Sequence, residues 1–486
     1  MNNKSLPSPF LSLIPILVLV IMLAITIYIF GSDALAGGSQ LCLLAATAFC
    51  AFIGIKKYNK TWKEYEVAIT SNIGEIAMTL IILLLIGALS GAWMISGVVP
   101  TFIYYGIQII DPNYFLVSTC LICAIVSVMT GSSWTTIATI GIALLGIGKA
   151  QGFEEGWIAG AIVSGAYFGD KISPLSDTTV LASSTTDTPL FTHIKYLMIT
   201  TVPSMFITLV IFTIVGVSHE TSSMIHLAEY TQTLDDTFDI SLWLFIVPIV
   251  TALMIAKRLP SIITLFLGTV CAIIFAFIFQ PDLLCNIAGD NEGGWISLIK
   301  GGMMTLFGGT SLDTGNAEIN ELIATRGMSG MMDTIWLIVC AMCLGGAMTA
   351  SGMIDSITSV FMRFTKNCVS LVSSTVASGL FMNLTTADQY ISIILTGNIF
   401  KDVYKRCGYE NRLLGRTIED AVTVTSPLIP WNSCGMTQAT VLGVSTLTYF
   451  PYCFFNYISP LMSITMAVIG FKILKRQPKT HVKESK

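Results

Sequence analysis

Gly169-Asp170-Lys171-Ile172-Ser173-Pro174-Leu175-Ser176-Asp177-Thr178-Thr179 is a polar stretch with a Ser-Pro break, placed between two apolar runs. A second stretch of the same kind is Glu419-Asp420-Ala421-Val422-Thr423-Val424-Thr425-Ser426-Pro427-Leu428-Ile429-Pro430-Trp431-Asn432. A charged side chain at mid-membrane costs roughly 2.5–3.5 kcal/mol. Because acids and hydroxyls occur twice inside apolar segments, we predict that the chain handles ions.

The composition is that of a polytopic membrane protein. Of 486 residues, 53% are hydrophobic and 11% are charged, against about 25% charged in soluble domains. Apolar runs of about 20 residues recur along the whole length, as helices that cross a ~30 Å hydrocarbon core require. The net charge of −4 is too small to indicate a nucleic-acid partner, and no spacing of nucleophile, base and orienting group indicates an enzyme. We predict an all-α multi-pass protein surrounded by membrane lipid, without catalytic residues or cofactors.

The apolar runs form two similar halves. Polar interruptions at 132–136 and 383–389 recur at an offset of about 250 residues, as do the two Ser-Pro breaks. Such interruptions at equivalent places are typical of transporter repeats. We predict two inverted repeats, each of about five transmembrane helices plus one re-entrant hairpin and a broken helix. The first repeat is 1–218, with hairpin 115–147 and broken helix 156–184; the second is 241–473, with insertion 281–330, hairpin 369–400 and broken helix 411–440.

Lysine and arginine in short loops predict the orientation. They gather at 56–63, 257–258, 401–412 and 472–479, whereas 219–239 has five acids and neither lysine nor arginine. We expect both termini, including the basic tail 474–486, on the cytoplasmic side of a bacterial-type inner membrane, and 219–240 as an extracytoplasmic acidic linker. Alternating spans satisfy these assignments only if the two hairpins are re-entrant. The hairpin tips and broken helices then converge at mid-membrane, where non-helical backbone must be buried or line a cavity.

Oxygen-bearing side chains surround these tips and breaks. A Ser-Pro break exposes backbone carbonyls, and the half-helix beyond it presents free N–H groups and a positive dipole end. Oxygen ligands suit hard cations rather than soft metals. The candidate ion or substrate ligands are Ser132, Ser133, Thr135, Asp170, Ser173, Asp177, Thr178, Asn383, Thr385, Thr386, Asp388, Thr425, Ser426, Trp431 and Asn432. Within this set we place Na+ near Ser133, Ser173, Asp177, Asn383, Asp388 and Ser426.

Several of these residues have a structural alternative. Asp177 and Asp388 have no basic neighbour in sequence, so we expect them to exchange a proton for sodium. Asp170, by contrast, could pair with Lys171, and Asp420 with Arg416. The Gly-Ser-Ser tip at 131–133 could be a contact between helices, and Trp431 could line the cavity or pack a helix. All four histidines are expected outside the spans, which argues against a histidine relay.

The motifs resemble those of a known family. The run 164–179, together with 131–134, 315–319 and 426–435, resembles the NhaC-type sodium/proton antiporters of the ion transporter superfamily. The resemblance implies exchange of Na+, the coupling ion, for protons by alternating access with an elevator-like movement, which favours a homodimer. The family is taken to include exchangers of organic solutes such as malate against lactate. A small organic anion or an amino acid therefore stays open as alternative cargo. A channel fits less well, because channels repeat around an axis along the membrane normal.

Overall fold

The computed structural model describes residues 6–30, 37–218, 224–257, 259–289, 294–363, 365 and 367–475. Within these ranges the ordered elements are helices, with two isolated β-bridges at Thr310–Thr325 and Tyr409–Lys475. Nine of the described helices are long and apolar enough to cross a membrane, or up to 11 spans if each bent pair counts as one. The prediction of an all-α multi-pass protein is confirmed. The inverted orientation of its halves stays a prediction.

Among the described residues, the first half and the linker after it contain twelve α-helices. They are α1 Pro9–Phe30, α2 Gly38–Tyr58, α3 Trp62–Glu75, α4 Ala77–Ile95, α5 Val98–Ile109, α6 Phe115–Thr130, α7 Ser133–Thr136, α8 Ile142–Ala150, α9 Glu155–Ile172, α10 Asp177–Thr185, α11 Leu190–Val217 and α12 Met224–Thr237. The predicted hairpin is α6 to α8, which turns at Gly131 and Ser132. The predicted broken helix is α9 and α10, separated by residues 173–176.

The described part of the second half contains thirteen α-helices. They are α13 Ile246–Ala256, α14 Ser261–Phe279, α15 Pro281–Ala288, α16 Trp295–Phe307, α17 Ala317–Ile323, α18 Met332–Ser351, α19 Met353–Arg363, α20 Cys368–Thr386, α21 Gln389–Arg406, α22 Asn411–Ile418, α23 Ser433–Leu442, α24 Thr446–Tyr449 and α25 Phe454–Ile469. The segment predicted as the second hairpin is α20 and α21, and that either hairpin is re-entrant stays a prediction. The second break separates α22 from α23, and it begins with a π-helical turn, Glu419–Thr423.

The segments of the predicted linker, insertion and tail are only partly described. The linker 219–240 is helical from Met224 to Thr237, and 219–223 lie outside the described residues. The insertion 281–330 contains α15 to α17, and 290–293 lie outside the described residues. Its helix α16 packs on α4, where a Cβ on Gly91 would lie 2.5 Å from the carbonyl oxygen of Thr305. Of the tail, only 474 and 475 are described.

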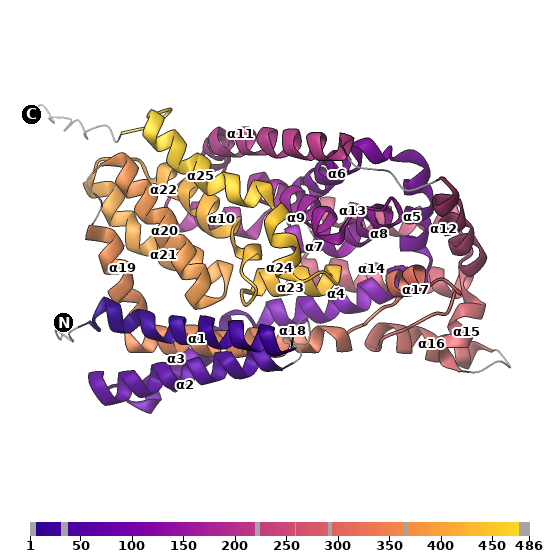
Figure 1. Ribbon diagram of the computed structural model, residues 1–486, viewed down its shortest axis with the longest axis horizontal. Coiled ribbons are helices and arrows are strands. Elements are labelled where there is room, and N and C mark those ends of the chain that lie inside the picture. The colour runs from indigo at the N-terminus through magenta and orange to yellow at the C-terminus, as the bar shows by residue number, and fades with distance from the viewer. Residues whose placement is uncertain are drawn as a thin grey trace, which may run out of the picture.

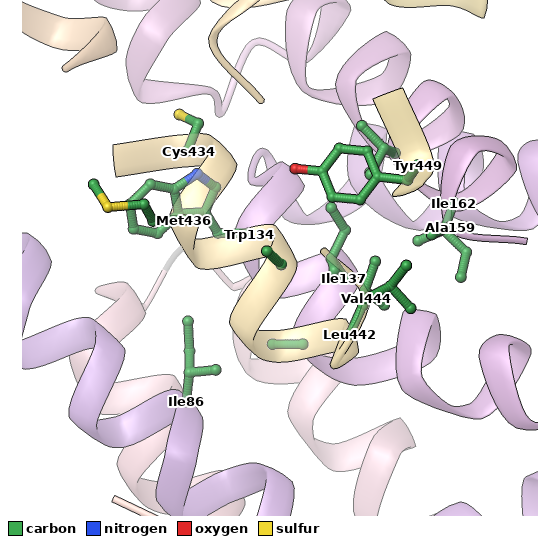
Figure 2. Close-up of a cluster of buried hydrophobic side chains, with 14 of the residues drawn as sticks. Ile86, Trp134, Ile137, Ala159, Ile162, Cys434, Met436, Leu442, Val444 and Tyr449 are labelled. Atoms are coloured by element: carbon green, nitrogen blue, oxygen red, sulfur yellow. The ribbon is translucent and has the colours of Figure 1, made fainter. Parts of the chain in front are cut away.

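The tip of the first hairpin and parts of both broken helices lie in the middle of the molecule. Figure 1 shows α1, α2, α3 and α18 along one long edge and α11 along the opposite edge, with α7, α9, α10 and α23 between them. Helix α1 begins, and α25 ends, at the same end of the molecule (Figure 1). Behind the first tip, Trp134 and Ile137 belong to one buried apolar cluster with Cys434, Met436 and Leu442 of the second half (Figure 2). The core therefore joins the two halves at the tip.

Candidate functional site

The tip of the first hairpin is bonded to the first broken helix. Both the backbone N–H and the hydroxyl of Ser133 donate to Oδ2 of Asp170, at 3.2 and 2.7 Å. Ser132 caps α7, where its hydroxyl oxygen accepts from the backbone N–H of Thr135 at 3.2 Å. The alternative of an Asp170–Lys171 bridge is not what the structure has, because Asp170 bonds to the tip and Lys171 bonds to Asp420 of the second half. This carboxylate is thus held at the place where the two interruptions meet.

Gly131 makes this close approach possible. Its φ is 67°, a left-handed conformation, and a Cβ there would lie 2.6 Å from the carbonyl carbon of Leu175 in the break. We expect Gly131→Ala to cost about 1–3 kcal/mol of stability through overpacking and to reduce transport by separating tip from break. Melting temperature and vesicle transport measure the two effects. Gly443→Ala is the matched control, because φ is 69° there and nothing lies within 4 Å. Equal losses at both positions would contradict the role of the contact.

Some residues of the first break cap or anchor helices, and Asp177 makes no such bond within the described part of the chain. Ser176 caps α10 by accepting from the backbone N–H of Thr179 at 3.3 Å, and its hydroxyl contacts that of Thr178 at 2.9 Å. Asp177 is the first residue of α10 and is exposed. The hydroxyl of Ser173 donates to the carbonyl oxygen of Val128 at 2.8 Å, which ties the break to α6. Ser173 therefore anchors the break, and Asp177 is free to meet an ion.

In the second half, Asp388 caps the helix that follows the tip. Its Oδ1 accepts from the backbone N–H groups of Tyr390 and Ile391 at 2.8 and 3.1 Å, and its Oδ2 accepts from the hydroxyl of Ser433 at 2.9 Å. The residue before it, Ala387, is left-handed with φ of 56°. Asp388 is fully buried. Capping accounts for its position, and its predicted exchange of a proton for sodium stays a prediction.

The second tip and the second break are bonded to each other. The Asn383 amide donates to the carbonyl oxygen of Val422 at 2.8 Å and to the hydroxyl of Thr425 at 3.1 Å. The Asn432 amide donates back to the carbonyl oxygen of Asn383 at 3.1 Å, and the Trp431 indole donates to that of Leu384 at 2.9 Å. The side-chain oxygen of Asn383 is buried and has no hydrogen-bond partner among the described residues. An orphaned carbonyl oxygen of this kind is a candidate cation ligand.

The remaining candidates of the second half bond locally. The hydroxyls of Thr385 and Thr386 donate to backbone carbonyls one turn back in α20, at 2.9 and 3.0 Å. The Ser426 hydroxyl donates to the carbonyl oxygen of Thr423 at 2.8 Å and lies 3.2 Å from Oε1 of Gln389. These bonds place Ser426 beside the first residue of α21. The second break thereby reaches the wall of the cavity described next.

A small cavity of about 40 Å³ receives residues from both halves. Six predicted ligands line it: Ser132, Ser133, Thr135, Asp170, Asp177 and Thr178. Ser173 and the predicted ligands of the second half are not among its lining residues. The second half contributes Gln389 and Tyr390 of α21 and Ser261 at the start of α14 instead. Sequence reasoning missed these three residues and also Thr79 of α4, which completes this part of the lining.

A buried ion pair joins the two broken helices directly. Lys171 of α9 bonds to Asp420 in the π-helical turn, and neither side chain is exposed. Asp420 also accepts from the hydroxyls of Ser459 and Thr200, at 2.8 and 3.1 Å. The alternative pairing of Asp420 with Arg416 is therefore not what the structure has: the Arg416 guanidinium lies over the ring of Tyr196, 4.9 Å from its centroid.

Comparison with known proteins identifies the family. A model of the Na+/H+ antiporter family matches residues 5–180 and 165–471. A Na+/H+ antiporter NhaC of Alkalihalophilus pseudofirmus is 37% identical over 437 residues, which are 90% of this chain and 90% of that protein. The chain belongs to the NhaC family of Na+/H+ antiporters. It is therefore a membrane transporter and not an enzyme.

Other relatives of this NhaC-family chain are named for the transport of other solutes. A malate-2H+/Na+-lactate antiporter of Bacillus subtilis is 34% identical over 434 residues, 89% of each protein. An arginine/ornithine antiporter of Halobacterium salinarum, ArcD, is 31% identical over 478 residues, 98% of this chain and 94% of that protein. Identity of this degree shows the family and leaves the cargo to be argued from the site.

One expectation about histidine is wrong for this NhaC-family protein. His193 lies in α11, within a candidate span at 190–218, and is fully buried. Its ring packs against Gly415 of α22, where a Cβ would lie 2.7 Å from the ring. Both ring nitrogens lack a hydrogen-bond partner among the described residues. The error arose because Thr192, His193 and Lys195 make the start of α11 look like a loop.

Proposed function

We propose that this NhaC-family chain exchanges Na+ for H+ across the membrane by alternating access. The observation that carries the proposal is the cavity where the first tip and first break meet α21. Two carboxylates, Asp170 and Asp177, and the hydroxyls of the tip line it. Oxygen ligands of this kind suit a hard cation, and a carboxylate that releases Na+ can take up a proton.

The size of the cavity supports a small cargo. A water molecule needs about 10–15 Å³ of such space, so a cavity of about 40 Å³ has room for a cation with one or two waters. In this conformation it is too small for an organic anion of several carbons. Sodium and protons would then compete for the same carboxylates, so that binding of one releases the other.

The ion pair between the breaks supports a movement of both broken helices together. Lys171 and Asp420 come from different halves and are both fully buried. Separating them in the membrane interior would leave two unpaired charges, at a cost of several kcal/mol for each ion. We therefore propose that α9–α10 and α22–α23 shift as one unit against the rest, in an elevator-like way. We also propose that the protein is a homodimer and that both termini of each chain lie in the cytoplasm.

Asp177→Asn tests the proposed exchange. The exposed carboxylate of Asp177 contributes charge to the cavity, whereas Ser176 and Thr178 supply the local hydrogen bonds of the break. We expect the variant to fold and to lose sodium-dependent proton movement in proteoliposomes, followed with a pH-sensitive dye. Asp187→Asn is the control, because Asp187 lies just beyond α10, is exposed and pairs with Lys401 at 2.7 Å. Unchanged exchange in Asp177→Asn would remove this residue from the mechanism.

A second candidate function is exchange of an organic anion or an amino acid with sodium. The relatives named as malate/lactate and arginine/ornithine antiporters favour it, since their identities of 34% and 31% are close to that of NhaC. Uptake of labelled malate, lactate and arginine into sodium-loaded vesicles separates the two functions. If none of them enters while the pH dye responds to sodium, the Na+/H+ function stands.

A further inference from the structure

An apolar groove lies on the surface of the molecule, and it shares no lining residue with the ion cavity. Its volume is about 470 Å³, and it runs between α2, α3 and α18. Leu44, Ala48, Phe52 and Ile55 of α2 and Trp62 of α3 line it, all of them exposed. Figure 1 shows these three helices together at the edge of the structure. Because α2 is long and apolar enough to cross a membrane, we expect the groove to face acyl chains.

Positive charge gathers at one end of this groove. Lys56 and Lys57 follow Ile55 directly and are both exposed, and Nζ of Lys56 lies 5.7 Å from the centroid of the Phe52 ring. No ion pair is found for either lysine within the described part of the chain. The nearby Lys60 and Lys63 are different, because they pair with Glu64 and Glu66 at 3.8 and 3.4 Å. Two ammonium groups without an ion-pair partner among the described residues therefore lie at one end of the apolar groove.

We propose that the groove binds one anionic phospholipid, with its phosphate at Lys56 and Lys57 and an acyl chain along α2. Both parts of such a molecule find a partner: the acyl chain contacts apolar side chains, and the phosphate contacts basic side chains, which attract anionic lipids near a membrane surface. The exposed Trp62 at the same end suits the boundary between chains and headgroups, where tryptophan is enriched.

The groove helices also touch the second hairpin tip. A Cβ on Gly345 of α18 would lie 3.1 Å from the carbonyl oxygen of Thr386 and 3.3 Å from the amide nitrogen of Asn72 in α3. A lipid wedged between α2, α3 and α18 would therefore hold the helices on which the tip rests. We expect faster transport in vesicles that contain phosphatidylglycerol than in vesicles of phosphatidylcholine alone.

Native mass spectrometry of the purified full chain, with phosphatidylglycerol or phosphatidylcholine added, tests the site. We expect one retained phosphatidylglycerol, and its loss in two independent variants. Lys56→Gln/Lys57→Gln removes the headgroup charges, and Ala48→Phe fills the groove from an exposed position. Lys472→Gln/Lys475→Gln is the matched control, since it removes two exposed lysines away from the groove and keeps the lipid. Melting temperatures confirm that each variant folds.

Two results would overturn the proposal. One is equal retention of phosphatidylglycerol by the unaltered chain, the lysine variant and the groove variant. The other is conversion of a dimer to a monomer by Ala48→Phe with the lipid still bound, because the groove would then receive a second copy of the chain. The mass of the bound lipid and the mass of the monomer or dimer are read in the same spectrum. The outcome is independent of the proposed Na+/H+ exchange, because binding is measured without transport.

Discussion

Lys171→Met is expected to destabilise the protein by about 3–5 kcal/mol, because it leaves Asp420 as an uncompensated buried charge. Lys171, Asp420 and their partner Ser459 are all fully buried, so no water replaces the lost ammonium group. The melting temperature of the purified protein and the yield of folded protein measure the loss. The loss measures how much this contact between the two halves stabilises the protein, since the pair joins residues 249 positions apart.

A second substitution distinguishes loss of charge balance from loss of packing. Lys171→Met combined with Asp420→Leu replaces the ion pair by apolar side chains, which is often neutral or stabilising, so we expect most of the stability to return. Lys401→Met is the matched control, because Lys401 pairs with Asp187 at the surface and exposed pairs contribute about 0–1 kcal/mol. Equal melting temperatures for Lys171→Met and Lys401→Met would show that the pair between the breaks is not a buried ion pair.

The double variant also tests the common movement of the broken helices. If apolar packing replaces the ion pair, the two breaks stay joined and exchange continues. A variant that folds but does not exchange would assign Lys171 or Asp420 a part in transport itself. The proposal that α9–α10 and α22–α23 move as one unit thus predicts continued exchange in the double variant, which a measurement of stability alone does not test.

The sequence predicted the interruptions because their cause is local. Proline removes a backbone donor in a helix, but Pro15, Pro203 and Pro460 lie inside continuous helices. Pro174 and Pro427 mark breaks because each stands in a cluster of polar residues between apolar runs. Gly131 before Ser132 marks a turn and a cap in the same way. The capping by Asp388 was also readable, because Asp immediately before an apolar helix is a typical N-cap. It was missed because the residue was considered only as an ion ligand.

The pairings between the halves could not be read from the sequence. Asp420 has Arg416 four residues away, a spacing that favours a bridge within a helix, but the π-helical turn Glu419–Thr423 changes the direction of the side chains there. Lys171 reaches Asp420 only because the two breaks pack together. Gln389 and Tyr390 reach the cavity for the same reason, since α10 packs on α21, where a Cβ on Gly397 would meet Thr185 at 2.2 Å. Contacts that depend on the packing of distant segments leave no local pattern.

Asp170→Asn is expected to weaken sodium binding strongly with a small effect on folding. Asparagine keeps the shape of the aspartate side chain. Its carbonyl oxygen can accept the two hydrogen bonds that Ser133 donates to Asp170 in the unaltered protein, at 3.2 and 2.7 Å. The cavity would lose a unit charge next to the cation. At an effective dielectric constant of 20, a charge about 4 Å away contributes roughly 4 kcal/mol, so we expect sodium affinity to fall by at least about 100-fold. The dependence of the melting temperature on sodium concentration measures that affinity without transport.

Ser133→Ala separates the charge from the hydrogen bond. It keeps the carboxylate of Asp170 and the backbone donor, and removes only the hydroxyl that donates at 2.7 Å. A single hydrogen bond contributes about 1 kcal/mol, so we expect sodium affinity to fall only about fivefold. Asp187→Asn, in the exposed turn beyond α10, should leave the affinity unchanged. If Ser133→Ala weakened sodium binding as much as Asp170→Asn, the shape of the tip would determine binding, and the carboxylate would not be the residue that holds the cation.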